Sequence, residues 1–382
     1  GRNVMVRMKS ARTYLMAGLL LGFFALLLID PENVLISGKK AVDLCLNIII
    51  PSLLPFFVVS RLILKTGAIH AISRLFKPLI KPLFNLPGQA AFPLITGWFS
   101  GYPAGAKYTA DLYENGLLTK DEAQRLLAFC NNSGPLFIVG AVGTGFFNSP
   151  RLGIVLLVCH LLASISVGIV YGLISRLQGY GKEAIKNISV ETRVAINGHM
   201  LTDAILDAIK VLLQICGTII FFAVLVQILE TAGLFLVFGN LPAPRQTNVL
   251  AEGVKVFVAG SLEVTYGLYL LSTSAGIPHY LKALLTSFLC GFGGFSVHTQ
   301  VTGLCPSDLK LKEYFLGKLA HGVLALVYTG LFLANGAIPV MANASVHFGE
   351  APVKILTMVY ILALIACMII LICKQPVRKS RE

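Results

Sequence analysis

Charged residues are scarce in this sequence. Asp, Glu, Lys and Arg make up 13% of the 382 residues, about half of their usual share in soluble domains, whereas 56% of the residues are hydrophobic. This balance excludes an ordinary soluble domain and indicates an all-α integral membrane protein. The net charge of +13 does not indicate a nucleic-acid partner, because the basic residues lie in short loops between apolar runs and there orient a chain in the bilayer.

Several patterns that carry chemistry are also missing. The eight Cys form no CxxC pair and mostly lie in apolar runs, which is typical of small buried residues rather than of a disulfide framework or a metal site. His, Asp and Glu show no metal-ligand spacing, so we expect no cofactor or metal. A Walker A loop is absent, which argues against ATP drive within this chain. No nucleophile and base stand out as a pair, so we expect that the protein is not an enzyme.

The apolar runs predict about eight transmembrane helices, near residues 14–29, 42–64, 126–147, 152–174, 203–228, 282–304, 314–334 and 352–373. Basic residues precede the first run as in a signal peptide, but no small-residue cleavage site follows, so we expect this run to be retained. The predicted units are an N-terminal transmembrane helix (1–35), a first gate-type repeat (36–180), a linker (181–200), a second repeat (201–337) and a C-terminal helix (350–373).

The run from 126 to 147 is interrupted at its middle by Cys130-Asn131-Asn132-Ser133-Gly134-Pro135. Pro135 lacks an amide donor and pushes the residue before it out of the helical region, so a helix should break here. A break within a bilayer is tolerated only where it is buried in protein or lines a wet cavity, and many transporters build their substrate sites from such breaks. The plain alternative is a polar kink that packs against neighbouring helices.

A matching interruption, from Cys290 to Gln300, divides the later apolar run. Cys130 and Cys290 are 160 positions apart (290 − 130), and His160 and His321 are 161 apart (321 − 160). This nearly constant spacing predicts two copies of one unit. Each copy contributes three crossings, and an odd number inverts the second copy relative to the first.

Each copy is also expected to contain a re-entrant hairpin. The stretch from 90 to 110 has too many Pro and Gly residues for one straight span, and its tip should lie between Gly97 and Gly105. The corresponding hairpin of the second copy is expected at about 254–274.

Two helices outside the spans have local signals. The loop that follows residue 64 spaces its apolar residues as in an amphipathic surface helix: Phe76, Leu79, Ile80 and Phe84. Further along, Thr119 and Glu122 form a capping box at the start of a helix.

Most Lys and Arg residues fall on one side of this arrangement, in the two tails and in the loops assigned to that side. This bias predicts that both termini are cytoplasmic. Arg61, Lys210 and Lys318 then lie at the cytoplasmic ends of their spans.

The two breaks predict a substrate site where half-helix ends meet near the middle of the membrane. Amino-terminal ends offer free amides to carboxylates, whereas carbonyl ends and Asn or Ser oxygens suit a cation. The residues expected at this site are Asn131, Asn132, Ser133, Gly134, Gly293, Gly294, Ser296, His298 and Gln300. The alternative is that Gly293 and Gly294 only allow close helix packing.

Other residues are candidates for gating, substrate contact or ion coupling. Ser100, Gly101 and Tyr102 of the first hairpin, and the second hairpin around Glu263, could close the site from opposite sides. Lys107 could pair with an anion, although a Lys near a span end usually extends to the surface. Glu263 could bind a proton or a cation, or it could be a solvated turn residue. His160 and His321 could relay protons, or they could be packing residues that make hydrogen bonds.

Three motifs of the sequence resemble a known family. They are Ser100-Gly101-Tyr102-Pro103-Ala104-Gly105-Ala106-Lys107, Asn131-Asn132-Ser133-Gly134-Pro135 and Gly291-Phe292-Gly293-Gly294-Phe295-Ser296-Val297-His298. They resemble the YlbJ family of sporulation integral membrane proteins, also called stage V sporulation protein V. The resemblance runs from the first span to the last. It places the chain among the nucleoside-recognition or gate-domain membrane proteins, whose hairpin-and-broken-helix plan is similar to that of concentrative nucleoside transporters.

The resemblance implies that the protein moves dipicolinic acid out of the mother cell across the outer forespore membrane. Lys107 and the amide-rich helix ends would suit the carboxylates of this planar dianion, and an aromatic side chain would suit its ring: Phe137, Phe292, Phe295 or Tyr102. The alternatives are a transporter of nucleosides or another small metabolite and a membrane scaffold that transports nothing. A homo-oligomer is compatible with all three.

Overall fold

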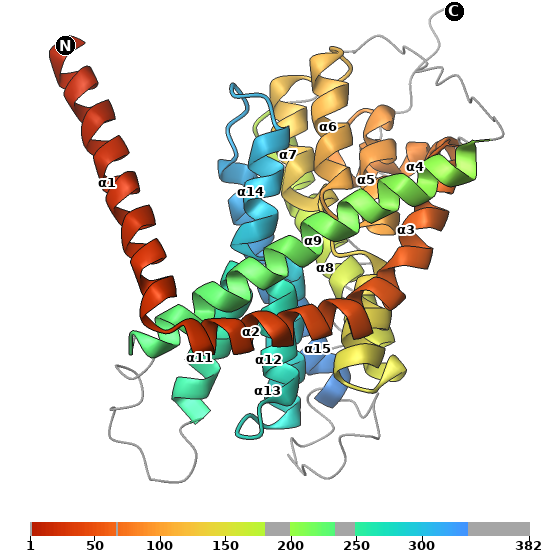
Figure 1. Ribbon diagram of the computed structural model, residues 1–382. Helices are drawn as coiled ribbons and strands as arrows, with labels where there is room; N and C mark the ends of the chain where they lie inside the picture. The colour runs from red at the N-terminus through yellow and green to blue at the C-terminus, as the bar shows by residue number, and fades with distance from the viewer. Residues whose placement is uncertain (1, 66–67, 180–198, 234–248, 335–382) are drawn as a thin grey trace, which may run out of the picture.

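The computed structural model describes residues 2–65, 68–179, 199–233 and 249–334, which form helices and connecting turns with no strand among them (Figure 1). The linker predicted at 181–200 lies mostly outside the described residues, and the final span at 350–373 lies wholly outside them. The helices of the first half are α1 (Arg2–Ile29), α2 (Pro31–Leu44), η1 (Cys45–Ile49), α3 (Ile50–Lys65), α4 (Ala68–Phe84), η2 (Gly88–Ala90), α5 (Ala91–Ser100), α6 (Ala104–Glu114), α7 (Lys120–Cys130), η3 (Phe137–Phe146) and α8 (Pro150–Leu177). Those of the second half are α9 (Met200–Thr231), α11 (Val249–Leu262), α12 (Val264–Thr273), α13 (His279–Phe292), α14 (Phe295–Leu304) and α15 (Lys312–Ala334).

The second helix of the chain begins earlier than expected. Asp30 ends α1 and caps α2, where its carboxylate accepts a hydrogen bond from the Asn33 amide at 3.4 Å, and Pro31 takes the first helical position. The helix then continues through α2, η1 and α3. It therefore begins at Pro31 and not at residue 42 as predicted.

Prolines alter this long helix without ending it. Pro55 lies inside α3, and a proline removes the hydrogen bond to the carbonyl four residues earlier. The wider π-helical turn η1 lies just before Pro51, which has no backbone N–H to donate within the helix. Figure 1 shows α2 running beside α9, and the Ser37 hydroxyl donates to the Ala223 carbonyl at 3.1 Å between these helices.

The amphipathic surface helix predicted after residue 64 is α4. Ile80 and Phe84 are buried in the core, whereas Leu75 and Leu79 are exposed on the opposite side. The apolar side chains spaced by four residues therefore form its inward face.

Both predicted helix breaks are present. α7 ends at Cys130, residues 131–134 are non-helical, and helical structure resumes at Pro135 before it widens into the π-helix η3. α13 ends at Phe292, and Gly293 has a φ of 75°, a left-handed conformation that glycine adopts without strain. α14 begins two residues later.

Both predicted hairpins are present as pairs of packed helices. α5 and α6 are joined by a turn at Gly101–Pro103, and α11 and α12 meet at the single non-helical residue Glu263. Figure 1 shows α5 and α6 in the upper half of the molecule and α11 and α12 in the lower half. Each half thus contains a long helix, a hairpin, a broken helix and a second long helix in this order.

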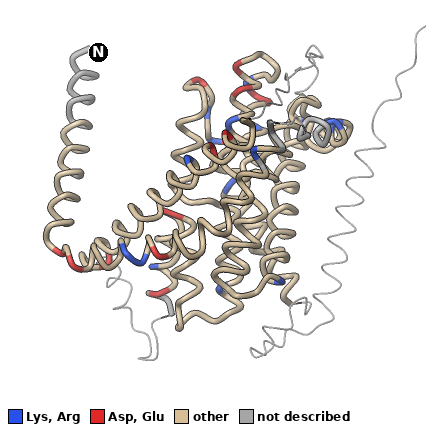
Figure 2. The backbone as a smooth tube through the Cα atoms, turned by 45° about the vertical axis from the view of Figure 1, so that its right-hand side comes forward, with Lys and Arg blue, Asp and Glu red and all other residues tan. Residues whose placement is uncertain are grey.

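The number of crossings and the inverted repeat remain predictions. Within the described residues, five helical segments are long and apolar enough to cross a membrane: Pro31–Val59, Pro150–Leu177, Met200–Thr231, His279–Leu304 and Lys312–Ala334. Figure 2 shows charged residues gathered toward the upper and lower ends of the described part, with few between them. This distribution is the one expected of an integral membrane protein.

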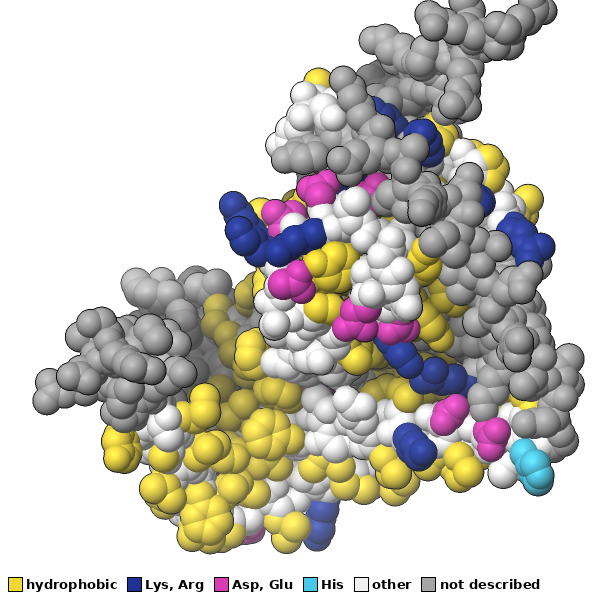
Figure 3. Space-filling model, turned by 90° about the horizontal axis from the view of Figure 1, so that it is seen from above, with side chains coloured by type: hydrophobic (Ala, Val, Ile, Leu, Met, Phe, Trp, Pro, Cys, Tyr) yellow, Lys and Arg dark blue, Asp and Glu magenta, His cyan; other side chains and the backbone are white. Residues whose placement is uncertain are grey.

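Polar contacts join the connections at the upper end. The capping box is confirmed, because the Glu122 amide donates to Thr119 Oγ1 and the Thr119 amide donates to the Glu122 carboxylate. The Tyr113 hydroxyl donates to Asp308, and this bond lowers the pKa of that carboxyl. Figure 3 shows basic and acidic side chains interspersed over this end.

A prediction follows from the close approach of the first hairpin to the first break. A Cβ at Gly97 would lie 1.8 Å from the Cys130 carbonyl oxygen, so Gly97→Ala should destabilise the protein by about 3 kcal/mol through overpacking. Thermal unfolding in detergent measures the change. Gly217→Ala in α9 is the matched control, since nothing lies within 4 Å of its added Cβ. A Gly97→Ala protein as stable as this control would contradict the packing.

Candidate functional site

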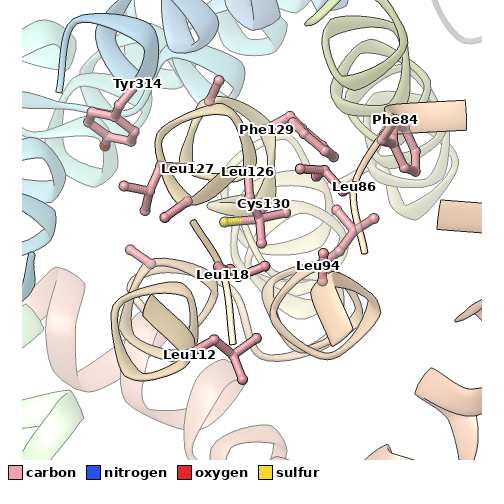
Figure 4. Packing of buried hydrophobic residues seen from close by; sticks show 14 of the residues in the cluster. Phe84, Leu86, Leu94, Leu112, Leu118, Leu126, Leu127, Phe129, Cys130 and Tyr314 are labelled. Atoms are coloured by element: carbon pink, nitrogen blue, oxygen red, sulfur yellow. The ribbon is translucent and has the colours of Figure 1, made fainter. Parts of the chain in front are cut away.

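The first break is held in place by the hydrophobic core around the end of α7. Phe129 and Cys130 are buried there, and Phe129 packs against Phe84 with ring centroids 4.9 Å apart. Figure 4 shows Phe129 next to Phe84 on one side of the cluster and Tyr314 on the opposite side. This packing fixes where the chain leaves the helix, so residues 131–134 start from a rigid support.

Ser133 joins the two broken helices. Its hydroxyl donates to the Cys290 carbonyl at 3.0 Å, near the end of α13. The Tyr102 hydroxyl of the first hairpin lies 3.1 Å from Ser133 Oγ. Ser133 is fully buried, so these contacts satisfy groups that have no access to water.

A second set of contacts lies behind the break. The Ser133 amide donates to His160 Nε2 at 3.2 Å, and His321 Nε2 lies 2.9 Å from the His160 carbonyl oxygen. The two imidazole rings have centroids 4.3 Å apart. The predicted pair of histidines is therefore in direct contact, between α8 and α15.

Lys318 completes this set. Its side chain is 0% exposed, and its Nζ donates to the Asn131 carbonyl at 2.9 Å and lies 3.5 Å from His321 Nδ1. The sequence placed Lys318 at the cytoplasmic end of its span. Lys318 does lie near the start of α15, which begins at Lys312, but its side chain is buried in the protein interior.

A cleft of about 150 Å³ opens beside the breaks. Corresponding elements of the two halves surround it: α3 and α9, the two hairpin turns, and the two broken helices. The lining residues are Leu53, Phe56, Phe57, Arg61, Ser100, Gly101, Tyr102, Pro103, Gly134, Phe137, Val211, Gln214, Ile215, Thr218, Glu263, Val264, Thr265, Ser296, Val297 and Gln300. A cleft lined mainly by apolar and aromatic groups, with a few convergent polar groups, is typical of a small-molecule site.

Each hairpin turn packs tightly against one break at the edge of this cleft. A Cβ at Gly101 would lie 2.8 Å from the Gly134 nitrogen, and one at Gly294 would lie 2.9 Å from the Val264 nitrogen. Backbone thus touches backbone at both edges, and only glycine leaves room for such an approach.

The cleft contains one basic and one acidic side chain, Arg61 and Glu263. Glu263 is 4% exposed and caps α12, where its Oε2 accepts the Tyr266 amide at 2.6 Å. It therefore differs from the alternative of a solvated turn residue. The backbone amides at the start of α12 stabilise the negative charge of this carboxylate.

Of the residues predicted for the site, seven line the cleft: Ser100, Gly101, Tyr102, Gly134, Ser296, Gln300 and Glu263. Others are near it but make internal contacts. Asn132 Nδ2 donates to the Phe129 carbonyl at 2.9 Å, and His298 Nδ1 lies 2.8 Å from the Tyr314 hydroxyl. Gly293 and Gly294 shape the second break.

Lys107 lies away from the cleft. Its side chain is exposed, and its Nζ is 5.9 Å from the centroid of the Tyr108 ring. This position agrees with the alternative that a Lys near a span end extends to the surface.

Sequence reasoning missed part of the cleft. It did not select Arg61, Phe56 and Phe57 of α3, or Gln214 and Thr218 of α9, although all five line it. A usable signal existed for Arg61 and Gln214, because ionisable and amide side chains inside an apolar run are unusual and often functional. The phenylalanines are indistinguishable in sequence from residues that face lipid.

Comparisons with known proteins find relatives of this chain by sequence. A family model described as "Nucleoside recognition" matches residues 46–184, which contain α3, the first hairpin, the first break and α8. The chain is 33% identical over 349 residues to the sporulation integral membrane protein YlbJ of Bacillus subtilis, a match that covers 85% of this chain and 84% of the relative. It is 26% identical over 133 residues to an uncharacterized protein of Alkalihalophilus pseudofirmus, which covers 34% of this chain and 28% of that protein. No solved structure matches it.

The link between the breaks can be tested with Ser133→Ala. The Cys290 carbonyl would lose its hydrogen-bond donor in a buried place, which should cost about 1–3 kcal/mol of unfolding free energy. Thermal unfolding in detergent measures this loss. Ser272→Ala is a suitable control, since the Ser272 hydroxyl only donates to the Tyr269 carbonyl of its own helix. Equal stability of the two variants would show that Ser133 does not join the broken helices.

Proposed function

The chain belongs to the family of the sporulation integral membrane protein YlbJ, and on this premise we propose that it is a secondary transporter or facilitator of dipicolinic acid. In this proposal it moves dipicolinate out of the mother cell across the outer forespore membrane during sporulation. The name of the Bacillus subtilis relative supports a role in sporulation, and the long apolar helices support residence in the membrane. Both termini are proposed to lie in the cytoplasm.

The observation that favours transport is the position of the cleft. It lies between corresponding elements of the two halves, at the two helix breaks. Secondary transporters bind their substrates at such breaks and expose the site to each side in turn by moving one part against the other. An enzyme or a scaffold has no need of this arrangement, so we propose neither catalysis nor a purely structural role.

The chemistry of the cleft suits a small aromatic carboxylate. Arg61 supplies a guanidinium, which binds carboxylates in a bidentate manner. Phe56, Phe57 and Phe137 supply apolar ring faces, and the Ser100 and Ser296 hydroxyls supply further hydrogen bonds. The volume of about 150 Å³ is below the range of pockets for drug-sized ligands, about 300–1,000 Å³, which favours a compact substrate.

Glu263 opposes a dianion in this cleft. Its carboxylate stands on the same surface as Arg61, so a substrate with two negative charges meets one attractive and one repulsive side chain. In the proposal, dipicolinate lies with one carboxylate at Arg61 and with its ring between the phenylalanines. Besides this small anion, the proposed partners are the lipid bilayer and further copies of this chain, and no nucleic acid.

A nucleoside is the second candidate substrate. It is favoured by the family model for nucleoside recognition over residues 46–184 and by the carboxylate of Glu263, which could accept hydrogen bonds from sugar hydroxyls.

Arg61→Gln tests the role of the guanidinium. In liposomes that contain the purified protein, this change should raise the KM for labelled dipicolinate about tenfold or more, because a hydrogen bond to a charged group contributes about 1.5–3 kcal/mol. Lys210→Gln is the matched control, since Lys210 is exposed on α9 and does not line the cleft. An unchanged KM in Arg61→Gln would remove Arg61 from the site.

Glu263→Gln separates the two candidate substrates. Glutamine keeps an oxygen that can accept the Tyr266 amide but removes the charge, so the KM for dipicolinate at neutral pH should fall several-fold. Uptake of labelled dipicolinate and of labelled uridine by the same liposomes measures both responses. If uridine is transported and its KM rises in the variant while dipicolinate is not transported, the nucleoside proposal replaces this one.

A further inference from the structure

Lys318 is a buried cation at the point where the first helix breaks. Its side chain is fully buried, and its Nζ lies between the Asn131 carbonyl oxygen at 2.9 Å and His321 Nδ1 at 3.5 Å. The elements α7, α8 and α13 pack against α15.

None of the groups that face Lys318 is a carboxylate. The titratable groups around it are Cys130 from α7, His160 from α8, Cys290 from α13 and His321 from α15 itself, and His298 of α14 contacts Tyr314 one turn away. Among the described residues, Lys318 forms no ion pair with Asp or Glu. An ammonium without a counter-ion in a dry interior is costly, so the carbonyl end of α7 is its main electrostatic partner.

The hydrogen bonds set the protonation of both histidines. The His160 carbonyl can only accept, so His321 carries its proton on Nε2 and turns the lone pair of Nδ1 toward Lys318. The Ser133 amide can only donate, so His160 Nε2 has a lone pair and its proton is on Nδ1. That Nδ1 is buried and has no hydrogen-bond partner among the described residues. The lone pair of His321 Nδ1 thus faces the Lys318 side chain.

A chain of contacts connects Lys318 to the cleft. It runs from Lys318 through His321 and His160 to Ser133, and from Ser133 Oγ to the hydroxyl of Tyr102, which lines the cleft. A change of charge at Lys318 therefore acts on the same backbone that forms the wall of the substrate site.

We propose that Lys318 is the proton-binding site that couples substrate movement to a pH gradient, an inference that rests on the proposed function. Binding of one proton from water converts the amine to the ammonium, and release returns that proton to water, with no other bond made or broken. The ammonium balances the partial negative charge at the carbonyl end of α7 and holds the break against α15. The neutral amine does so more weakly, which loosens the break and changes access to the cleft.

The experiment uses the full chain in liposomes, with labelled dipicolinate and an imposed pH difference. In the wild-type protein the gradient should change the initial rate about fivefold or more relative to equal pH. Lys318→Met replaces the buried cation by an apolar chain of similar length and leaves the Asn131 carbonyl without its donor, whereas Lys318→Arg keeps a permanent positive charge and a donor. Both variants should lose the response to the gradient, and Lys318→Arg, which can still donate to the Asn131 carbonyl, should retain exchange at equal pH.

Lys282→Met is the matched control. Lys282 is also mostly buried and donates to a carbonyl, that of Ser272, but it lies outside the chain of contacts to the cleft. This variant should respond to the gradient as the wild type does. A wild-type rate that ignores the gradient, or a gradient response that persists in both Lys318 variants, would overturn the inference while leaving dipicolinate transport intact.

A second measurement keeps the inference testable if the wild-type protein moves no dipicolinate, a result that would sink the proposed function instead. Acid–base titration of the purified protein in detergent, between about pH 6 and pH 9, counts the protons that it binds. The wild type should bind about one more proton than Lys318→Met over this range, because a group that titrates within it releases its proton there. Equal proton uptake by the two proteins would overturn the role of Lys318.

Discussion

Two helices that stop inside the protein must find partners for the backbone groups that their ends expose, and this requirement organises the structure. The Cys290 carbonyl at the end of α13 accepts a hydrogen bond from the Ser133 hydroxyl. The Asn131 carbonyl just beyond α7 accepts one from Lys318 Nζ. An unpaired carbonyl in a dry interior costs several kcal/mol. The breaks persist because each is satisfied by a group from the other broken helix or from α15.

The cleft is a consequence of the same arrangement. Each hairpin turn reaches one break by backbone contact, Gly101 at Gly134 and Glu263 at Gly294. The turns and breaks then form two walls, and α3 and α9 form the others. The polar groups of the site are held by capped helices and a packed core, so their positions are set before any substrate arrives.

The sequence predicted the breaks, the hairpins and the capping box, because each depends on local chemistry such as Pro135, Gly293 or Thr119. It predicted less well which side chains face the cleft. The sequence predicts that Asn131 and Asn132 contact the substrate. In the structure the Asn132 side-chain amide donates to the Phe129 carbonyl, and the Asn131 backbone carbonyl accepts a hydrogen bond from Lys318. The sequence did not show that Lys318 is buried, because a Lys in the first turns of an apolar helix resembles one that extends to the surface. Its burial depends on α7, which lies almost 190 residues earlier in the chain.

The most direct measurement of the central claim is a structure of the purified protein in lipid with dipicolinate at saturation. The account predicts density for the ring in the cleft, one carboxylate within hydrogen-bond distance of the Arg61 guanidinium, and helices that still break at 131–134 and 293–294. Dipicolinate bound elsewhere with this cleft empty, or helices that run unbroken through both positions, would contradict it.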